Sequence, residues 1–180
     1  GVTVVAARKS VKSGSKSNGS RGSGRGKTIK IDLSGLNITE EEFNRALTEG
    51  AKKLGALKRA AERITDQRVR GKAYAVCDSV ARILSDIRED PKDLRPARKF
   101  LDYYLDATIK VVDRYASLSA KSVRSDDVDQ SLARVENSLD TIKSAYDKQL
   151  AQLLENDVLD LDTELQVLER TIQMEGLGDS

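Results

Sequence analysis

The stretch SDDVDQSLARVENSLDTIKSAYDKQLAQLLENDVLDLDTELQVLERTI, residues 125–172, determines most of the expected architecture. Apolar side chains recur through it at steps of three and four residues, which places them on one face of an α-helix. Ser125 or Asp126 can cap the first turn. The stretch therefore predicts one very long helix. Its apolar positions are Val128, Leu132, Val135, Leu139, Ile142, Tyr146, Leu150, Leu154, Val158, Leu161, Leu165, Leu168 and Ile172.

The mean step along this stripe is about 3.67 residues, the value of an eleven-residue repeat, which runs straight or slightly right-handed. At 1.5 Å per residue, an unbroken helix here is about 70 Å long, and its expected neighbours reach little more than half that length. The sequence leaves two alternatives open. Either the helix bends at the acidic residues 155–162 and folds back, or its end projects and needs a partner.

Three shorter helices are expected before the long one. Thr39 with Glu42 three residues later fits a capping box, so the first helix starts there and runs to about residue 64. The apolar stripe then changes phase, and Thr65 or Asp66 can cap a second helix. Pro91 suits the first turn of a third helix, which continues to about residue 120.

These patterns together predict an all-α fold. We expect an elongated antiparallel bundle of about four helices over residues 39–177, with a very long C-terminal helix. Residues 31–38 are expected to form a linker, and residues 1–30 a disordered basic Gly/Ser tail.

The composition excludes several classes of protein. The 180 residues include no histidine, so histidine-based catalytic triads and zinc sites are impossible within this chain. Cys77 is the only cysteine, and its small apolar neighbours predict a packed core thiol in preference to a reactive nucleophile. We therefore predict no catalytic residues and no cofactor.

The tail carries a strong charge asymmetry. Residues 1–30 hold eight basic side chains and no acidic one, although the whole chain has a net charge of only +2. Between residues 10 and 27 most residues are Gly or Ser, a composition typical of disordered segments. We expect this tail to contact anionic lipid at the cytoplasmic face of the cell membrane. The eight residues are Arg8, Lys9, Lys12, Lys16, Arg21, Arg25, Lys27 and Lys30.

The first seven residues, GVTVVAA, are apolar and stop abruptly at Arg8 and Lys9. They are too short to span a bilayer, which needs about 20 residues. The run and its basic flank match the cytoplasmic end of a membrane-spanning helix. We therefore expect a truncated membrane anchor, and the alternative is a frayed cytosolic terminus.

The segment RGSGRGKT, residues 21–28, comes close to a phosphate-binding loop. The pattern G-x-x-x-x-G-K-[ST] requires glycine where Arg21 stands, and Gly22 leaves the loop one residue short. A P-loop also needs a helix that starts at its Lys-Thr, and no helix is expected before Thr39. We interpret the segment as part of a flexible cationic tether whose phosphate partners are lipid headgroups.

Three carboxylates of the long helix are weak candidates for a metal site. Asp157, Asp160 and Glu164 lie on one helical face, where carboxylates can hold Mg²⁺ together with water and substrate phosphates. They also border the apolar stripe, where acidic residues ordinarily keep a helix soluble. We favour the solvated face and predict no metal.

Nucleic acid is not an expected specific partner. Tyr103, Tyr104 and Tyr115 are concentrated in the third helix, whose charges nearly balance. Stacking platforms for nucleic acid need aromatic side chains within a basic groove. Basic residues of the tail alone give only sequence-blind contacts.

Three stretches resemble the bacterial XpaC family, the 5-bromo-4-chloroindolyl phosphate hydrolysis family. They are ITDQRVRGKAYAVCDSVARILSDI (residues 64–87), DPKDLRPARKFLDYYLDATIKVVDRYASL (residues 90–118) and LLENDVLDLDTELQVLERTIQMEGL (residues 153–177). The resemblance implies a cytoplasmic helical domain behind membrane segments, and a relation to toxic-anion (tellurite) resistance proteins.

Two functions follow as hypotheses. The first is a membrane-tethered cytoplasmic scaffold or adaptor, with a role in envelope stress or toxic-anion resistance, whose long helix recruits a protein partner or self-associates. The alternative is a metal-assisted phosphohydrolase that acts on phosphomonoesters through Asp157, Asp160 and Glu164. The first is favoured because the residues of a known phosphatase mechanism are missing from the sequence.

Overall fold

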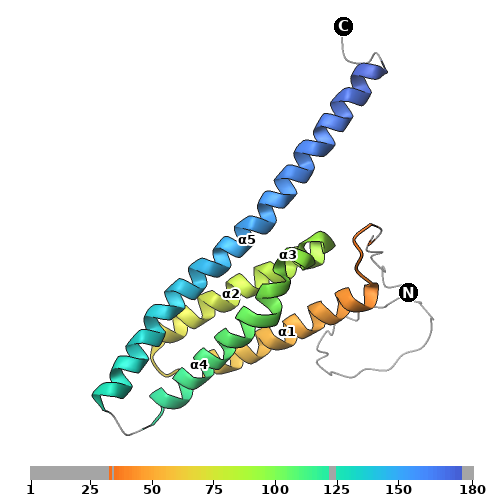
Figure 1. The fold of residues 1–180 in the computed structure, drawn as a ribbon. Helices are drawn as coiled ribbons and strands as arrows, with labels where there is room; N and C mark the ends of the chain where they lie inside the picture. Colours follow the sequence, from red (N-terminus) through yellow and green to blue (C-terminus); the bar gives the residue numbers. More distant parts are fainter. Residues whose placement is uncertain (1–32, 34, 122–124, 176–180) are drawn as a thin grey trace, which may run out of the picture.

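The computed structural model describes residues 33, 35–121 and 125–175, and this part of the chain is helical (Figure 1). As predicted, it forms an elongated bundle with a long C-terminal helix. Consecutive long helices alternate in direction. In chain order the elements are α1 (Glu40–Glu62), α2 (Gln67–Glu89), a 3₁₀ turn η1 (Pro91–Asp93), α3 (Leu94–Lys99), a π-helical segment η2 (Phe100–Tyr104), α4 (Leu105–Ser119) and α5 (Asp126–Met174).

The helix starts follow the capping signals in the sequence. The Thr39 hydroxyl accepts a hydrogen bond from the backbone N–H of Glu42, at 3.1 Å. The Asp66 carboxylate accepts from the N–H groups of Arg68 and Val69, so the predicted break near residues 64–66 lies between α1 and α2. These side chains satisfy N–H groups that a helix leaves unpaired at its first turn.

The third helix differs from the expected continuous one. It begins as the 3₁₀ turn η1 and contains the π-helical segment η2 before it continues as α4. The hydroxyls of Thr108 and Tyr146 both donate to the carbonyl oxygen of Tyr104, at 2.9 and 3.0 Å. Phe100 packs edge-on against the Tyr146 ring, with 4.7 Å between ring centroids. Tertiary contacts with α5 thus surround the π-helical segment η2. The sequence pattern did not predict this segment.

The core lies between α1, α2, α4 and the first half of α5. Aliphatic side chains dominate it, as the low aromatic content predicts. Cys77 is fully buried there, and burial raises the pKa of its thiol to about 11, so it is a packed thiol. Leu33 and Ile38 of the segment before α1 also pack against the core. The buried residues of α5 are Leu132, Leu139, Tyr146 and Leu153.

A ladder of polar contacts aligns α5 with α2 and η1, which run in the same direction. Each rung joins residues separated by 68 positions, so the register is constant along the ladder. Donor–acceptor distances range from 2.6 to 2.7 Å at the closest atoms. This constant register keeps α5 aligned with α2 and η1 up to residue 160. The rungs are Arg68–Glu136, Lys72–Asp140, Ser79–Asp147 and Lys92–Asp160.

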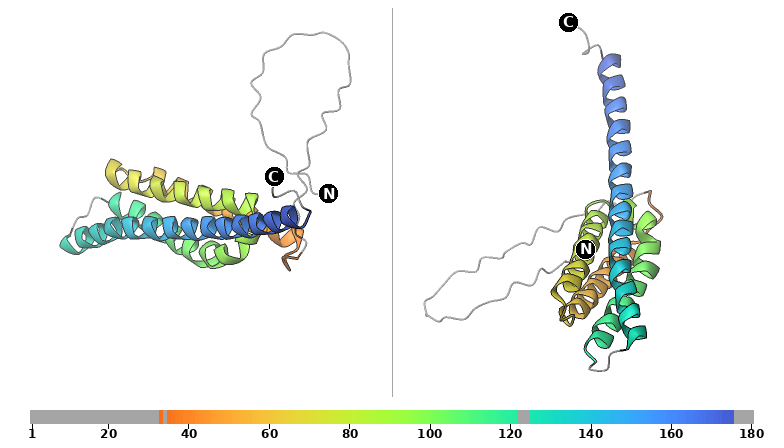
Figure 2. Two further views of the ribbon diagram at one scale, coloured as in Figure 1. Left: turned by 90° about the horizontal axis from the view of Figure 1, so that it is seen from above. Right: turned by 90° about the vertical axis from the view of Figure 1, so that its left-hand side faces the viewer.

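Beyond the last rung, α5 continues without a break to Met174 (Figures 1 and 2). The far end of the helix stands clear of the rest of the bundle in Figure 1 and in the right-hand view of Figure 2. Of the two alternatives left open by the sequence, the structure has the projecting helix and not the bend at residues 155–162. The basic tail and the first seven residues lie outside the described residues.

Candidate functional site

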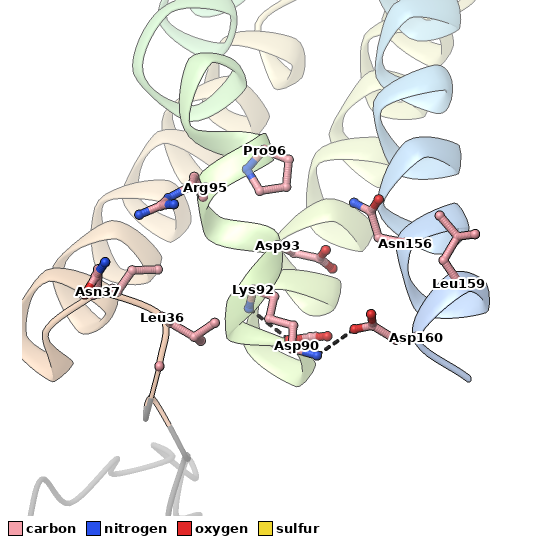
Figure 3. Close-up of a pocket in the computed structure, with 12 residues that line it drawn as sticks. Leu36, Asn37, Asp90, Lys92, Asp93, Arg95, Pro96, Asn156, Leu159 and Asp160 are labelled. Carbon is pink, nitrogen blue, oxygen red and sulfur yellow. Dashed lines mark hydrogen bonds and ion pairs between the residues drawn. The ribbon is translucent and has the colours of Figure 1, made fainter. Parts of the chain in front are cut away.

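A pocket of about 390 Å³ lies where the segment before α1, the turn η1 and α5 meet (Figure 3). Side chains from all three elements line it, so it depends on the tertiary fold and not on one stretch of sequence. Its lining combines cations with carboxylates and includes Asp93, a carboxyl residue that is almost fully buried. The lining residues are Gly35, Leu36, Asn37, Ile38, Asp90, Lys92, Asp93, Arg95, Pro96, Asn156, Leu159 and Asp160.

Lys92 connects the two sides of this pocket. Its Nζ lies 2.6 Å from Oδ2 of Asp160 on α5, and its backbone N–H donates to Oδ1 of Asp90, at 2.9 Å (Figure 3). The hydrogen bond with Asp160 raises the pKa of Lys92. Both side chains of the pair are about half exposed, so solvent screens their attraction and the pair adds little stability. Its role is to fix the position of α5 against η1.

Asp93 is the most unusual group in the pocket. The residue is only 2% exposed, and its Oδ2 has no hydrogen-bond partner among the described residues. Burial, followed by repulsion from Asp157, Asp90, Asp86 and Asp160, raises the pKa of Asp93 from 3.8 to about 7. Asp93 can therefore hold or release a proton near neutral pH, a property that ordinary carboxyls lack.

A second buried carboxyl oxygen belongs to the same cluster. Oδ2 of Asp86, at the end of α2, also lacks a partner in the described part of the molecule. Burial and then the charges of Asp157 and Glu89 raise its pKa. Asp157 thus acts on both buried carboxyls. The end of the bundle concentrates negative charge that is only partly balanced by Lys92 and Arg95.

The structure separates the three predicted metal candidates. Asp160 forms the ion pair with Lys92, and Asp157 faces the buried carboxyls. Glu164 lies one turn farther out, where its charge still affects Lys92. Within residues 33, 35–121 and 125–175, no three or more Asp, Glu or Cys side chains are grouped so that they could hold a metal ion.

Sequence reasoning missed Asp86 and Asp93. The available signal was the run of acidic residues around Pro91, which also marks the end of one helix and the start of the next. Asp160-Leu161-Asp162 spells Asp-x-Asp, a phosphatase nucleophile motif, so the expectation that such residues are missing from the sequence is wrong for this tripeptide. On a helix two residues at this spacing point about 160° apart, so the pair cannot converge on one phosphate. The buried Asp93, with the half-buried Asp86 nearby, is the better chemical candidate.

A second functional feature is the exposed apolar surface of α5. Every residue from position 154 to 175 is exposed. Six apolar side chains in this part lie on one face and are between 36% and 58% exposed. We call them the distal stripe. Its members are Leu154, Val158, Leu161, Leu165, Leu168 and Ile172.

The distal stripe does not continue the face that packs on the bundle. Leu153 is fully buried, whereas Leu154 is 48% exposed. The line that faces the bundle continues from Leu153 to Asp157 and Asp160, which contact or face η1. The distal stripe is rotated from this line by roughly 100°, the angle between successive helical residues. The apolar stripe predicted from the sequence packs against the core as far as Leu150. From Leu154 onward it is exposed, and the residues that face the bundle stand one position earlier in the sequence, beginning with Leu153.

None of the described helices is both long enough and apolar enough to cross a bilayer. The expected anchor at residues 1–7 lies outside this comparison.

Comparison with known proteins identifies one family. A family model described as 5-bromo-4-chloroindolyl phosphate hydrolysis protein matches residues 13–168. No curated protein and no solved structure was found to match. The match covers most of the 180 residues, including the buried carboxyls, the last rung of the ladder and most of the distal stripe. The chain belongs to the 5-bromo-4-chloroindolyl phosphate hydrolysis, or XpaC, family.

Proposed function

We propose that this chain is a helical scaffold or adaptor that the basic tail tethers to the cytoplasmic face of the membrane. The observation that carries the proposal is the distal stripe, an exposed apolar face on a helix that extends beyond its own bundle. The exposure of six aligned aliphatic side chains does not stabilise a soluble domain. Exposed apolar surfaces of this kind are typical of interaction sites. A role in envelope stress or toxic-anion resistance is consistent with such an adaptor.

The tether makes a prediction about lipid binding. The eight basic residues of the tail can each contribute roughly 1 kcal/mol near an anionic surface, and salt weakens this attraction. We expect the purified chain to sediment with vesicles that contain anionic phospholipid at low ionic strength, and to be released at about 0.5 M salt. Vesicles of neutral phospholipid should not bind it.

Two variants control this experiment. One lacks residues 1–30, and the other keeps the full length but replaces the eight Lys and Arg residues of the tail with Gln. Both should lose vesicle binding while their circular dichroism stays helical. Binding that ignores salt, or that survives in either variant, would rule out the tether.

A second candidate function is phosphomonoester hydrolysis, for which the family is named. In its favour, the pKa of Asp93 is about 7, the range of a general acid, and Lys92 and Arg95 line the same pocket and can attract a phosphate. Against it, Lys92 is already paired with Asp160, and a water path to the buried Asp93 oxygen is closed in this conformation.

An assay with 5-bromo-4-chloroindolyl phosphate distinguishes the two functions. We expect purified protein supplied with Mg²⁺ or Mn²⁺ to release no indolyl product above background. Product formation that Asp160→Asn or Asp93→Asn abolishes, while exposed Asp102→Asn leaves it intact, would establish the hydrolase instead.

A further inference from the structure

The spacing within the distal stripe is that of a coiled coil. Its steps are 4, 3, 4, 3 and 4 residues, which form two interleaved seven-residue series. Val158, Leu165 and Ile172 occupy the a positions of these heptads, and leucines occupy the d positions. The mean of about 3.67 residues over the whole helix conceals this regular distal part. Val158 and Ile172 are β-branched, and β-branched residues at a with leucine at d favour two-stranded association, whereas Leu165 departs from this rule.

The residues that flank this seam are acidic. Asp157 and Glu164 occupy g positions, and Glu155, Asp162 and Glu169 occupy e positions. From residue 154 to 174 the helix carries six acidic side chains and one basic side chain, Arg170. Within this part only Asp160 has a basic partner from another described element, which is Lys92. The two sides of the apolar seam are therefore negatively charged.

This charge pattern discriminates between possible occupants. In a parallel pair of identical helices each g residue faces an e residue of the other helix, and in an antiparallel pair g faces g and e faces e. Each arrangement of two copies therefore places acid against acid along the seam. An anionic lipid surface meets the same repulsion. Only a partner with basic residues beside its apolar face is complementary in charge to the distal stripe.

We infer that the distal stripe binds a basic amphipathic helix of another protein, with Lys or Arg beside its apolar face, to form a two-stranded coiled coil. The inference rests on the proposed scaffold function and specifies the chemistry of its partner. Because the stripe is rotated away from the face that packs on the bundle, the partner can lie along it without displacing α2 or η1.

The test uses two synthetic 21-residue peptides with Ile at a, Leu at d and neutral residues at b, c and f. One has Lys at every e and g position, and the other has Glu. The full chain should bind the Lys peptide and not the Glu peptide in fluorescence anisotropy titrations. Leu161→Ser with Leu165→Ser should weaken binding of the Lys peptide at least about a hundredfold.

A matched control replaces apolar residues outside the seam. Leu159→Ser with Val167→Ser removes two exposed side chains at b and c positions and should leave affinity within about threefold. Changing Asp162, Glu164 and Glu169 to Lys should reverse the preference, so that the Glu peptide binds and the Lys peptide does not. All variants should keep the melting temperature of the parent, because the altered side chains are exposed.

Several outcomes would overturn the inference. Equal binding of both peptides, or no binding, rules out a basic helix as the occupant. A dimer of the chain alone in sedimentation equilibrium, lost in the Leu161→Ser, Leu165→Ser variant, makes a second copy the occupant. Vesicle binding that depends on these leucines makes lipid the occupant. The tether is tested separately, since vesicle binding through the tail does not involve the stripe.

Discussion

Asp93→Asn is expected to raise the free energy of unfolding at about pH 8 by up to about 4 kcal/mol, and to change it little at about pH 3. Asn matches the neutral carboxyl in shape but cannot ionise. Its amide N–H groups can also donate to neighbouring carboxylates of the cluster, such as that of Asp157. The measurement is urea unfolding of both proteins at a series of pH values.

The sign follows from the direction of the shift in pKa. Asp93 binds its proton more tightly in the folded state, with a pKa of about 7, than in the unfolded state, with an ordinary value of 3.8. The protonated group therefore favours folding most at acid pH. This advantage falls as the pH rises from about 4 to about 7, and above that range the folded protein holds a buried, ionised carboxylate. Asn removes this cost.

Asp102→Asn provides the control, because Asp102 is an exposed aspartate on the π-helical segment. It should leave the pH dependence of stability unchanged. A destabilising effect of Asp93→Asn at all pH values would contradict the prediction and indicate that the carboxyl accepts hydrogen bonds that the amide cannot replace.

Most helix boundaries were predictable because they depend on neighbouring residues. Thr39, Asp66 and Ser125 cap the helices that the sequence assigned to them. The π-helical segment was not predictable, since its surroundings are contacts with Tyr146 on a distant helix. The choice between a bent and a projecting α5 also required tertiary structure, because an uninterrupted helical pattern is compatible with both.

The candidate site was less predictable than the fold. The sequence drew attention to Asp157 and Asp160. In the structure Asp160 lines the pocket and pairs with Lys92, and the charge of Asp157 acts on Asp93. The central residue, Asp93, looked like an ordinary acid in the first turn of a helix. Its raised pKa results from burial in the folded bundle and then from nearby charges such as that of Asp157 on α5, and a local pattern contains no information on burial.

Leu153 and Leu154 show within a single dipeptide that a local sequence pattern does not predict burial. Leu154 fits the helical spacing of the apolar stripe better, yet Leu153 is the residue that the core buries. After Leu153 the residues of α5 that face the bundle are acidic, namely Asp157 and Asp160. The apolar residues form the distal stripe, which points away from the bundle. Adjacent leucines thus mark the change from an internal contact to an external surface.

Leu153→Ala is expected to lower the free energy of unfolding by about 2 to 5 kcal/mol, and Leu154→Ala by no more than about 0.5 kcal/mol. The two substitutions are chemically identical and lie in the same helix, so helix propensity contributes equally to both. The difference comes from the cavity that the loss of Leu153 leaves in the core. Urea unfolding monitored by circular dichroism measures both values.

The same pair separates stability from recognition. Leu154 is the first d position of the distal stripe, so Leu154→Ala should weaken binding of the Lys peptide by roughly tenfold while the fold stays intact. Leu153→Ala should leave that affinity nearly unchanged below its unfolding transition, because Leu153 faces the bundle and not the partner. If the two leucines exchanged these effects, α5 would pack on the bundle through the stripe that the sequence predicts, and the proposed docking surface would be part of the core.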